Sequence, residues 1–155
     1  MPKSKKAHVS GLEDHLGYWL RHVSNQVSHA FSRKVEARGV TVAEWVILRV
    51  LYDEESLAPS ALADRLGMTR GAISKLADRL VAKALATRTA DVNDRRFQEL
   101  ALTAAGRALV PELSDLADRN DAEFFGHLTA LERAEVERVM RGIVDKLAPR
   151  ASPID

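Results

Sequence analysis

Small polar and cationic side chains recur along one predicted helix in the middle of the chain. Between residues 69 and 80, apolar residues follow one another at three- and four-residue spacing, which places them on one helix face. The intervening residues carry hydroxyl, guanidinium or ammonium groups or no side chain: Thr69, Arg70, Gly71, Ser74, Lys75 and Arg79. Such groups can bind phosphate oxygens and base edges. The same residue types also occur on solvated helix faces that bind nothing.

The residues that precede this helix favour a functional interpretation. A short helix is predicted from Pro59 to Leu66, because proline suits a first helical position and the apolar residues keep helical spacing. Gly67 ends that helix and Met68 fills the corner. Thr69 is then the N-cap of the next helix. A turn of three residues sets two helices at a steep angle, which is typical of a helix-turn-helix.

A predicted hairpin follows the second helix. Its strands are residues 85–90 and 97–103, and its tip is residues 91–96, where Asn and Asp favour a turn. Arg95 and Arg96 project two cations from this tip, which suits a groove lined with phosphates. Asp94 either forms the turn or holds one of these arginines in a forked pair.

This combination resembles the winged-helix MarR family of bacterial transcription regulators. The matching segments are residues 62–67 in the first helix, 73–80 in the recognition helix, 91–96 in the wing, and 100–106, where the family has an LT-x-x-G motif. One departure is Ala84, where the family usually has the glycine that closes the recognition helix. Since a left-handed cap strains a residue other than glycine, the end of that helix is predicted only to within a turn.

The resemblance implies a mainly α fold, an α+β winged helix-turn-helix with long terminal helices that form a dimerisation region. It also implies a regulator, usually a repressor, whose pseudo-palindromic operator is released when a small aromatic or amphipathic acid binds. Within this scheme Arg70 and Lys75 are expected to contact bases, since arginine can hold guanine in a forked pair. Arg95 is expected to enter a minor groove. The alternative is a winged helix that contacts proteins without specific DNA binding.

Amphipathic helices are predicted at both ends of the chain, over residues 10–38 and 104–149. Capping boxes at Ser10 and Glu13, Thr41 and Glu44, and Thr129 and Glu132 mark three helix starts. We expect one domain over residues 10–149, with the winged helix-turn-helix at 41–103, a disordered basic tail at 1–9 and a second tail at 150–155. The end helices either form a two-fold dimer, which separates two recognition helices by about 34 Å, or close a monomeric bundle.

A cluster of aromatic residues is a candidate ligand site. Tyr18, Trp19, His22 and Trp45 lie on helices that are expected to meet near the DNA-binding segment. Core and interface packing is the simpler explanation for them. The family resemblance implies instead a pocket for a small acid, whose carboxylate would contact Arg49 or Arg21.

Composition excludes several classes of function. The 155 residues are 46% hydrophobic, which is enough for one ordinary core. The chain has no cysteine, so disulfides, zinc-thiolate sites and thiol redox sensing are excluded. No secretory signal or bilayer-length apolar run is present, so a cytoplasmic location without membrane contact is expected. Residues 59–103 carry eight basic and five acidic side chains, whereas residues 104–155 carry seven and ten, so positive charge concentrates in the DNA-binding segment.

Four histidines, His8, His15, His22 and His29, are spaced by seven residues. If one helix carried them all, neighbours would lie about 10 Å apart, too far for a single metal ion. We therefore predict no metal site and interpret the stripe as an interface edge. No phosphate loop, HExxH motif or nucleophile elbow occurs, so neither a cofactor nor catalysis is expected.

Overall fold

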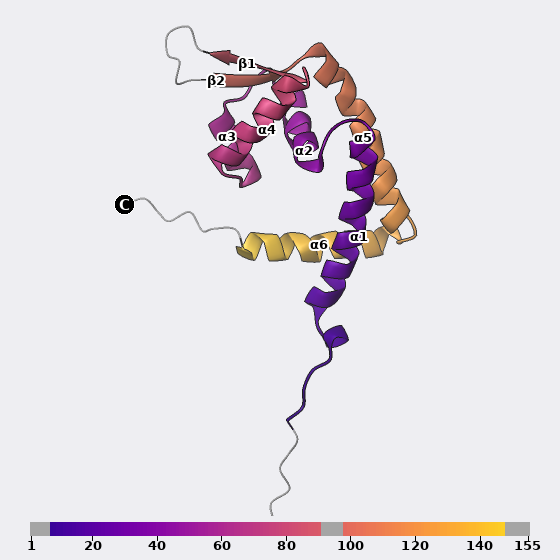
Figure 1. The fold of residues 1–155 in the computed structure, drawn as a ribbon. Helices are drawn as coiled ribbons and strands as arrows, with labels where there is room; N and C mark the ends of the chain where they lie inside the picture. The colour runs from indigo at the N-terminus through magenta and orange to yellow at the C-terminus, as the bar shows by residue number, and fades with distance from the viewer. Residues whose placement is uncertain (1–6, 91–97, 148–155) are drawn as a thin grey trace, which may run out of the picture. The chain divides into compact units, whose positions relative to one another are not determined.

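A computed structural model describes residues 7–90 and 98–147 (Figure 1). These residues form two compact units, one that ends at Asp118 and one that begins at Arg119. The first unit contains helices α1 to α4, the hairpin β1–β2 and the start of α5, and the second contains the end of α5 and all of α6. The predicted extent of a single domain, residues 10–149, stays a prediction.

The predicted helix-turn-helix is confirmed as a fold. Helix α3 spans Pro59–Leu66 and helix α4 spans Arg70–Ala82. Gly67 separates them with a φ of 63°, a left-handed conformation in which glycine meets no steric cost. The hydroxyl of Thr69 accepts a hydrogen bond of 3.1 Å from a backbone N–H in the first turn of α4, as expected for an N-cap.

The hairpin consists of β1 (Ala86–Ala90) and β2 (Gln98–Leu102), paired antiparallel with Ala86 opposite Leu102. Leu57 pairs with the other side of β2, because its backbone exchanges hydrogen bonds of 2.9 and 2.8 Å with Leu100. The hairpin is therefore anchored to the segment between helices α2 and α3. This pairing holds the strands beside the helix-turn-helix.

Helix α4 ends where the family resemblance predicted the end of this helix, although the residue there is not glycine. Ala84 adopts a φ of 57° directly after α4. A left-handed conformation costs a non-glycine residue about 1–2 kcal/mol. The carbonyl of Ala84 accepts a hydrogen bond of 2.7 Å from the Thr103 hydroxyl, which helps to hold this conformation.

The first helix begins later than predicted. A 3-10 turn, Leu12–Asp14, precedes α1, which spans Leu16–Glu36. The Gly11 N–H bonds to the Asp14 carboxylate at 2.8 Å, so the expected pair of Ser10 and Glu13 does not cap this helix. His15 has extended backbone and interrupts the helical path. The 3-10 turn forms instead of a longer helix because the Asp14 carboxylate already accepts a hydrogen bond from the free Gly11 N–H.

Helix α2 spans Val42–Tyr52 and starts at the predicted N-cap, since Thr41 Oγ1 accepts a 3.2 Å bond from the Glu44 N–H. Only this half of the predicted capping box is present, because the Glu44 carboxylate binds the ammonium of Lys83 instead. Helices α1 to α5 and strand β2 all contribute to one hydrophobic core. Its fully buried large side chains include Val35, Ile47, Leu48, Leu51, Leu62, Ile73, Leu80, Leu100 and Leu113. The predicted apolar stripes of α3 and α4 are therefore confirmed as core-facing.

Helix α5 spans Ala104–Phe125, with Pro111 inside it, and helix α6 spans Ala130–Leu147. The predicted capping box of α6 is confirmed, because Thr129 and Glu132 exchange two side-chain-to-backbone bonds of 3.1 Å. The bond from the Thr129 backbone lowers the pKa of the Glu132 carboxyl. Within residues 7–90 and 98–147, no helix is both long enough and apolar enough to cross a bilayer.

Candidate nucleic-acid interface

Helix α4 separates its side chains into a buried and an exposed face. Ile73, Leu76, Ala77 and Leu80 lie in the core. The residues predicted from the sequence are all exposed, at the cap and along the other face, where Asp78 is exposed as well: Thr69, Arg70, Gly71, Ser74, Lys75 and Arg79. The structure thus brings all six onto one solvent-facing surface. We refer to this set as the α4 outer face.

The α4 outer face offers hydrogen-bond donors of several kinds. Arg70 and Lys75 present guanidinium and ammonium donors, and arginine can bind a base edge or a phosphate through two parallel bonds. The Thr69 oxygen already accepts the capping bond, yet its O–H stays available to donate. A Cβ built on Gly71 meets no atom within 4 Å, so the surface at that position is open to a close approach.

Sequence reasoning missed one residue that shapes this surface, Arg88 in β1. Its guanidinium lies 2.6 Å from Asp78 of α4 and donates a 3.1 Å bond to the carbonyl of Ser74. This arginine therefore ties the hairpin to α4 and neutralises the acidic side chain that α4 carries. Its charge was visible in the sequence, but no local pattern predicted its partner on another element.

Asp94, Arg95 and Arg96, the predicted wing contacts, lie outside the described residues. The strands that lead to and from this segment are in place, with Ala90 paired to Gln98. The expected roles of these three residues stay predictions.

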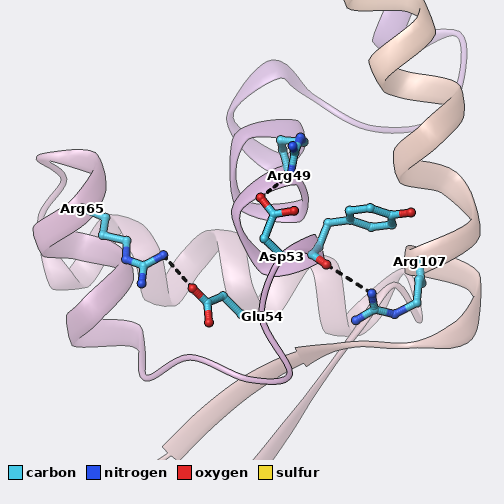
Figure 2. Close-up of polar contacts among 6 residues, drawn as sticks. Arg49, Asp53, Glu54, Arg65 and Arg107 are labelled. Carbon is cyan, nitrogen blue, oxygen red and sulfur yellow. Dashed lines mark hydrogen bonds and ion pairs between the residues drawn. The ribbon is translucent and has the colours of Figure 1, made fainter.

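Ion pairs and hydrogen bonds hold the corner between α2 and α3 (Figure 2). Arg65 of α3 lies 3.0 Å from Glu54 in the preceding loop. Arg107 of α5 donates a 3.2 Å bond to the carbonyl of Tyr52 at the end of α2. A basic side chain at a helix C-terminus is favourable because the last carbonyls carry partial negative charge. These contacts fix the segment that supports the helix-turn-helix.

The predicted ligand residues fall into separate groups in a single chain. Tyr18 contacts Trp19 edge to face, with ring centroids 5.3 Å apart, and stacks on His22 at 6.2 Å. Trp45 instead packs against Phe31, at 6.5 Å between centroids. Since Phe31 follows His22 by nine residues on α1, the two groups lie about 13 Å apart along the helix axis.

Arg49, the predicted partner of a ligand carboxylate, forms a 2.8 Å ion pair with Asp53 (Figure 2). Its guanidinium carbon also lies 5.8 Å from the centre of the Tyr52 ring. An incoming acid would have to compete with Asp53 for this cation. The composition of a ligand pocket stays a prediction.

The histidine stripe is shorter than predicted. His8 and His15 precede α1, so only His22 and His29 belong to that helix. In the part of the chain that the structure describes, no three or more histidine, aspartate or glutamate side chains gather in an arrangement for a metal ion.

Taken together, the fold and the α4 outer face define a winged helix-turn-helix protein. The MarR family model matches residues 38–96, which contain α2, α3, α4 and β1. HTH-type transcriptional repressor Rv2887 of Mycobacterium tuberculosis is 30% identical over 125 residues, which cover 81% of this chain and 90% of the relative.

Two solved structures have the same fold. A mutant of Escherichia coli MarR complexed with operator DNA is 25% identical, with a TM-score of 0.75, and the match covers 83% of this chain and 92% of that one. Bordetella bronchiseptica BpsR, whose DNA binding is regulated by 6-hydroxynicotinic acid, is 25% identical with a TM-score of 0.79, over 89% of this chain and 99% of that one.

This chain belongs to the MarR family and is a transcriptional regulator. The prediction that it is not an enzyme is confirmed, because the relatives are transcriptional regulators.

Proposed function

We propose that this protein is a dimeric repressor that binds a pseudo-palindromic operator through helix α4 and residues 91–96 of each subunit. The observation that carries the proposal is the division of α4 into a buried apolar face and an exposed face rich in donors. Two comparisons support it, since one relative is named a repressor and one structural neighbour holds operator DNA.

In this proposal the α4 outer face enters the major groove. Arg70 and Lys75 contact base edges, where the pattern of donors and acceptors distinguishes all four base pairs. Thr69, Ser74 and Arg79 bind phosphates or further base edges, and Gly71 permits close approach. Arg95, with Arg96 and Asp94 beside it, places the wing in the minor groove, where narrow A/T-rich segments concentrate negative potential.

Dimerisation is proposed from the apolar surface that a single chain leaves exposed. On α6 these exposed residues recur at helical spacing and include Val136, Val139, Met140, Ile143 and Leu147, while Leu12, Leu16, Leu20 and Val23 are exposed near the N-terminus. Within Ala130–Leu147, no residue is buried in one chain. Exposed apolar surface on this scale marks an interaction site, and a second copy would supply the two recognition helices that a palindrome requires.

Substitutions of Arg70 and Arg95 are expected to affect DNA binding in different ways. Arg70→Ala should cost about 1–3 kcal/mol and relax preference at one base position, because it removes a base contact. Arg95→Ala should weaken binding to all sequences and lower the log-log salt slope by about one unit for each phosphate that Arg95 neutralises. Fluorescence anisotropy with operator variants and a salt series measures both effects.

Arg138→Ala is the matched control, because Arg138 is exposed on the face of α6 opposite the apolar residues and pairs with Glu135 of the same helix. It should leave operator affinity unchanged. Wild-type affinity in both the Arg70 and the Arg95 variant would rule out the assigned contacts. A wild-type protein without salt-dependent DNA affinity would favour the alternative, a protein-interaction module.

We further propose that a small aromatic acid releases the operator. BpsR supports this, since its DNA binding is regulated by 6-hydroxynicotinic acid. Benzoate and 6-hydroxynicotinate are expected to release operator DNA, whereas benzamide should not, because it lacks the carboxylate that Arg49 would bind. Arg49→Gln should weaken the response to both acids. Calorimetry with parallel anisotropy tests this, and equal responses to benzoate and benzamide would exclude recognition of the carboxylate.

A further inference from the structure

One buried carboxylate lies at the junction of three elements in the first unit. Glu44, in the first turn of α2, is 1% exposed. The ammonium of Lys83, the C-cap residue of α4, lies 2.7 Å from its Oε2 atom. The same Lys83 Nζ donates a 2.8 Å bond to the carbonyl of Gly39, in the turn between α1 and α2. We call this set of contacts the Glu44–Lys83–Gly39 bridge.

The bridge constrains the position of the end of α4. A buried carboxylate is unfavourable without a charged or hydrogen-bonding partner, so Lys83 cannot leave Glu44 at little cost. Two short bonds to different elements restrict the ammonium to a small volume, and through it the last turn of α4. Directly afterwards, Ala84 is held in its left-handed conformation by Thr103.

Small rotations about this end have large effects at the other end of α4. Arg70 and Lys83 are thirteen residues apart, which corresponds to about 20 Å of helix. A rotation of about 5° about Lys83 therefore moves Arg70 by about 2 Å. A forked contact to a base tolerates only a few tenths of an ångström, since hydrogen bonds weaken steeply away from their preferred length and angle.

We propose that Glu44 and Lys83 are positioning residues, which set the angle at which α4 presents Arg70 and Lys75 to the bases without touching DNA themselves. This inference rests on the proposed DNA-binding function. Non-specific binding depends mainly on phosphate contacts, which tolerate a wider range of geometries than base contacts. Removal of the bridge should therefore reduce preference for the operator more than general affinity for DNA.

The test separates positioning from stability. The double variant Glu44→Leu with Lys83→Met removes both charges together, so no buried carboxylate is left without a partner, and the Lys83 side chain, which is 37% exposed, is replaced by one of similar length. We expect its thermal unfolding midpoint to lie near that of the wild type. Its ratio of operator affinity to scrambled-duplex affinity should fall about tenfold, comparable to the removal of one base contact, while its affinity for the scrambled duplex stays the same.

Glu44→Gln is the second variant, because it keeps the shape and one acceptor oxygen for Lys83 and so is expected to fold whatever the double variant does. Its affinity ratio should fall by about threefold, between the wild type and the double variant. An unchanged ratio in Glu44→Gln, or an equal decrease on both duplexes in either variant, would overturn the inference. A wild-type protein that does not distinguish operator from scrambled duplex would instead refute the proposed function.

Discussion

Gly106→Ala is expected to destabilise the protein by about 2–3 kcal/mol, as measured by the free energy of unfolding in urea. A Cβ built at this position lies 2.1 Å from the carbonyl oxygen of Leu85 and 3.4 Å from a side-chain carbon of Leu102. The nearest atom belongs to the backbone, so it cannot move aside as the end of a flexible side chain would. Helix α5 or the start of the hairpin must shift instead.

The environment of Gly106 makes that shift costly. The Leu85 carbonyl already accepts a 3.1 Å bond from the Thr103 N–H, and the Thr103 hydroxyl accepts a 3.0 Å bond from the Gly106 N–H. Moving α5 would disturb these bonds, the first of which joins the residue directly before α5 to the connection between α4 and β1. The close approach of the Leu85 carbonyl to Gly106 explains why the LT-x-x-G motif of this chain ends in a residue without a side chain.

Gly71→Ala is the matched control, because a Cβ there meets nothing within 4 Å. Alanine is favoured over glycine inside a helix by roughly 0.5–1 kcal/mol, so this variant should be as stable as the wild type or slightly more stable. Similar stability of the Gly106 and Gly71 variants would show that α5 does not pack as closely as the structure indicates.

Ile143→Glu is expected to convert the proposed dimer into a monomer. Ile143 is 53% exposed in a single chain and lies within the apolar surface of α6. Full burial of an isoleucine contributes about 1.5–3 kcal/mol, and about half of this side chain is left for a partner to bury. A two-fold interface contains it twice, so the dimer should be weakened by about 1.5–3 kcal/mol. A carboxylate without a partner in the same place would destabilise the dimer further. Sedimentation at micromolar concentration measures the change.

The Ile143→Glu variant is also expected to bind the operator more weakly, because a monomer contacts only one half-site. Ala134→Glu adds the same charge on the opposite face of α6, nine residues earlier, and should leave both the dimer and operator binding intact. If wild-type protein sediments as a monomer, or if Ile143→Glu remains a dimer, the apolar face of α6 does not form the interface.

Local rules accounted for the helix-turn-helix and for most helix boundaries. Gly67 ends α3, Thr69 caps α4, and Thr129 pairs with Glu132 at the start of α6. These features depend on residues within about four positions of one another, so their chemistry can be read directly from the chain. The same rules gave the wrong start for the first helix, because the Gly11 N–H bonds to the Asp14 carboxylate and forms a separate 3-10 turn.

The faces of α4 were also predictable, since helical spacing alone divides apolar from polar residues. That reasoning identified Arg70, Lys75 and the other members of the α4 outer face. It did not indicate that Arg88 would reach α4 from β1, 14 residues after Ser74. Nor did it separate Trp45 from Trp19, which depends on where α2 crosses α1.

Tertiary packing alone determined which distant charges meet. Glu44 and Lys83 are 39 residues apart, and each has a conventional local explanation, one as a capping-box residue and the other as a basic helix end. Their contact exists because α2 and the end of α4 bury the carboxylate together, and a buried charge must find an opposite one. Periodicity indicates which side of a helix is apolar, whereas the partner of a charge depends on how separate helices are placed in space.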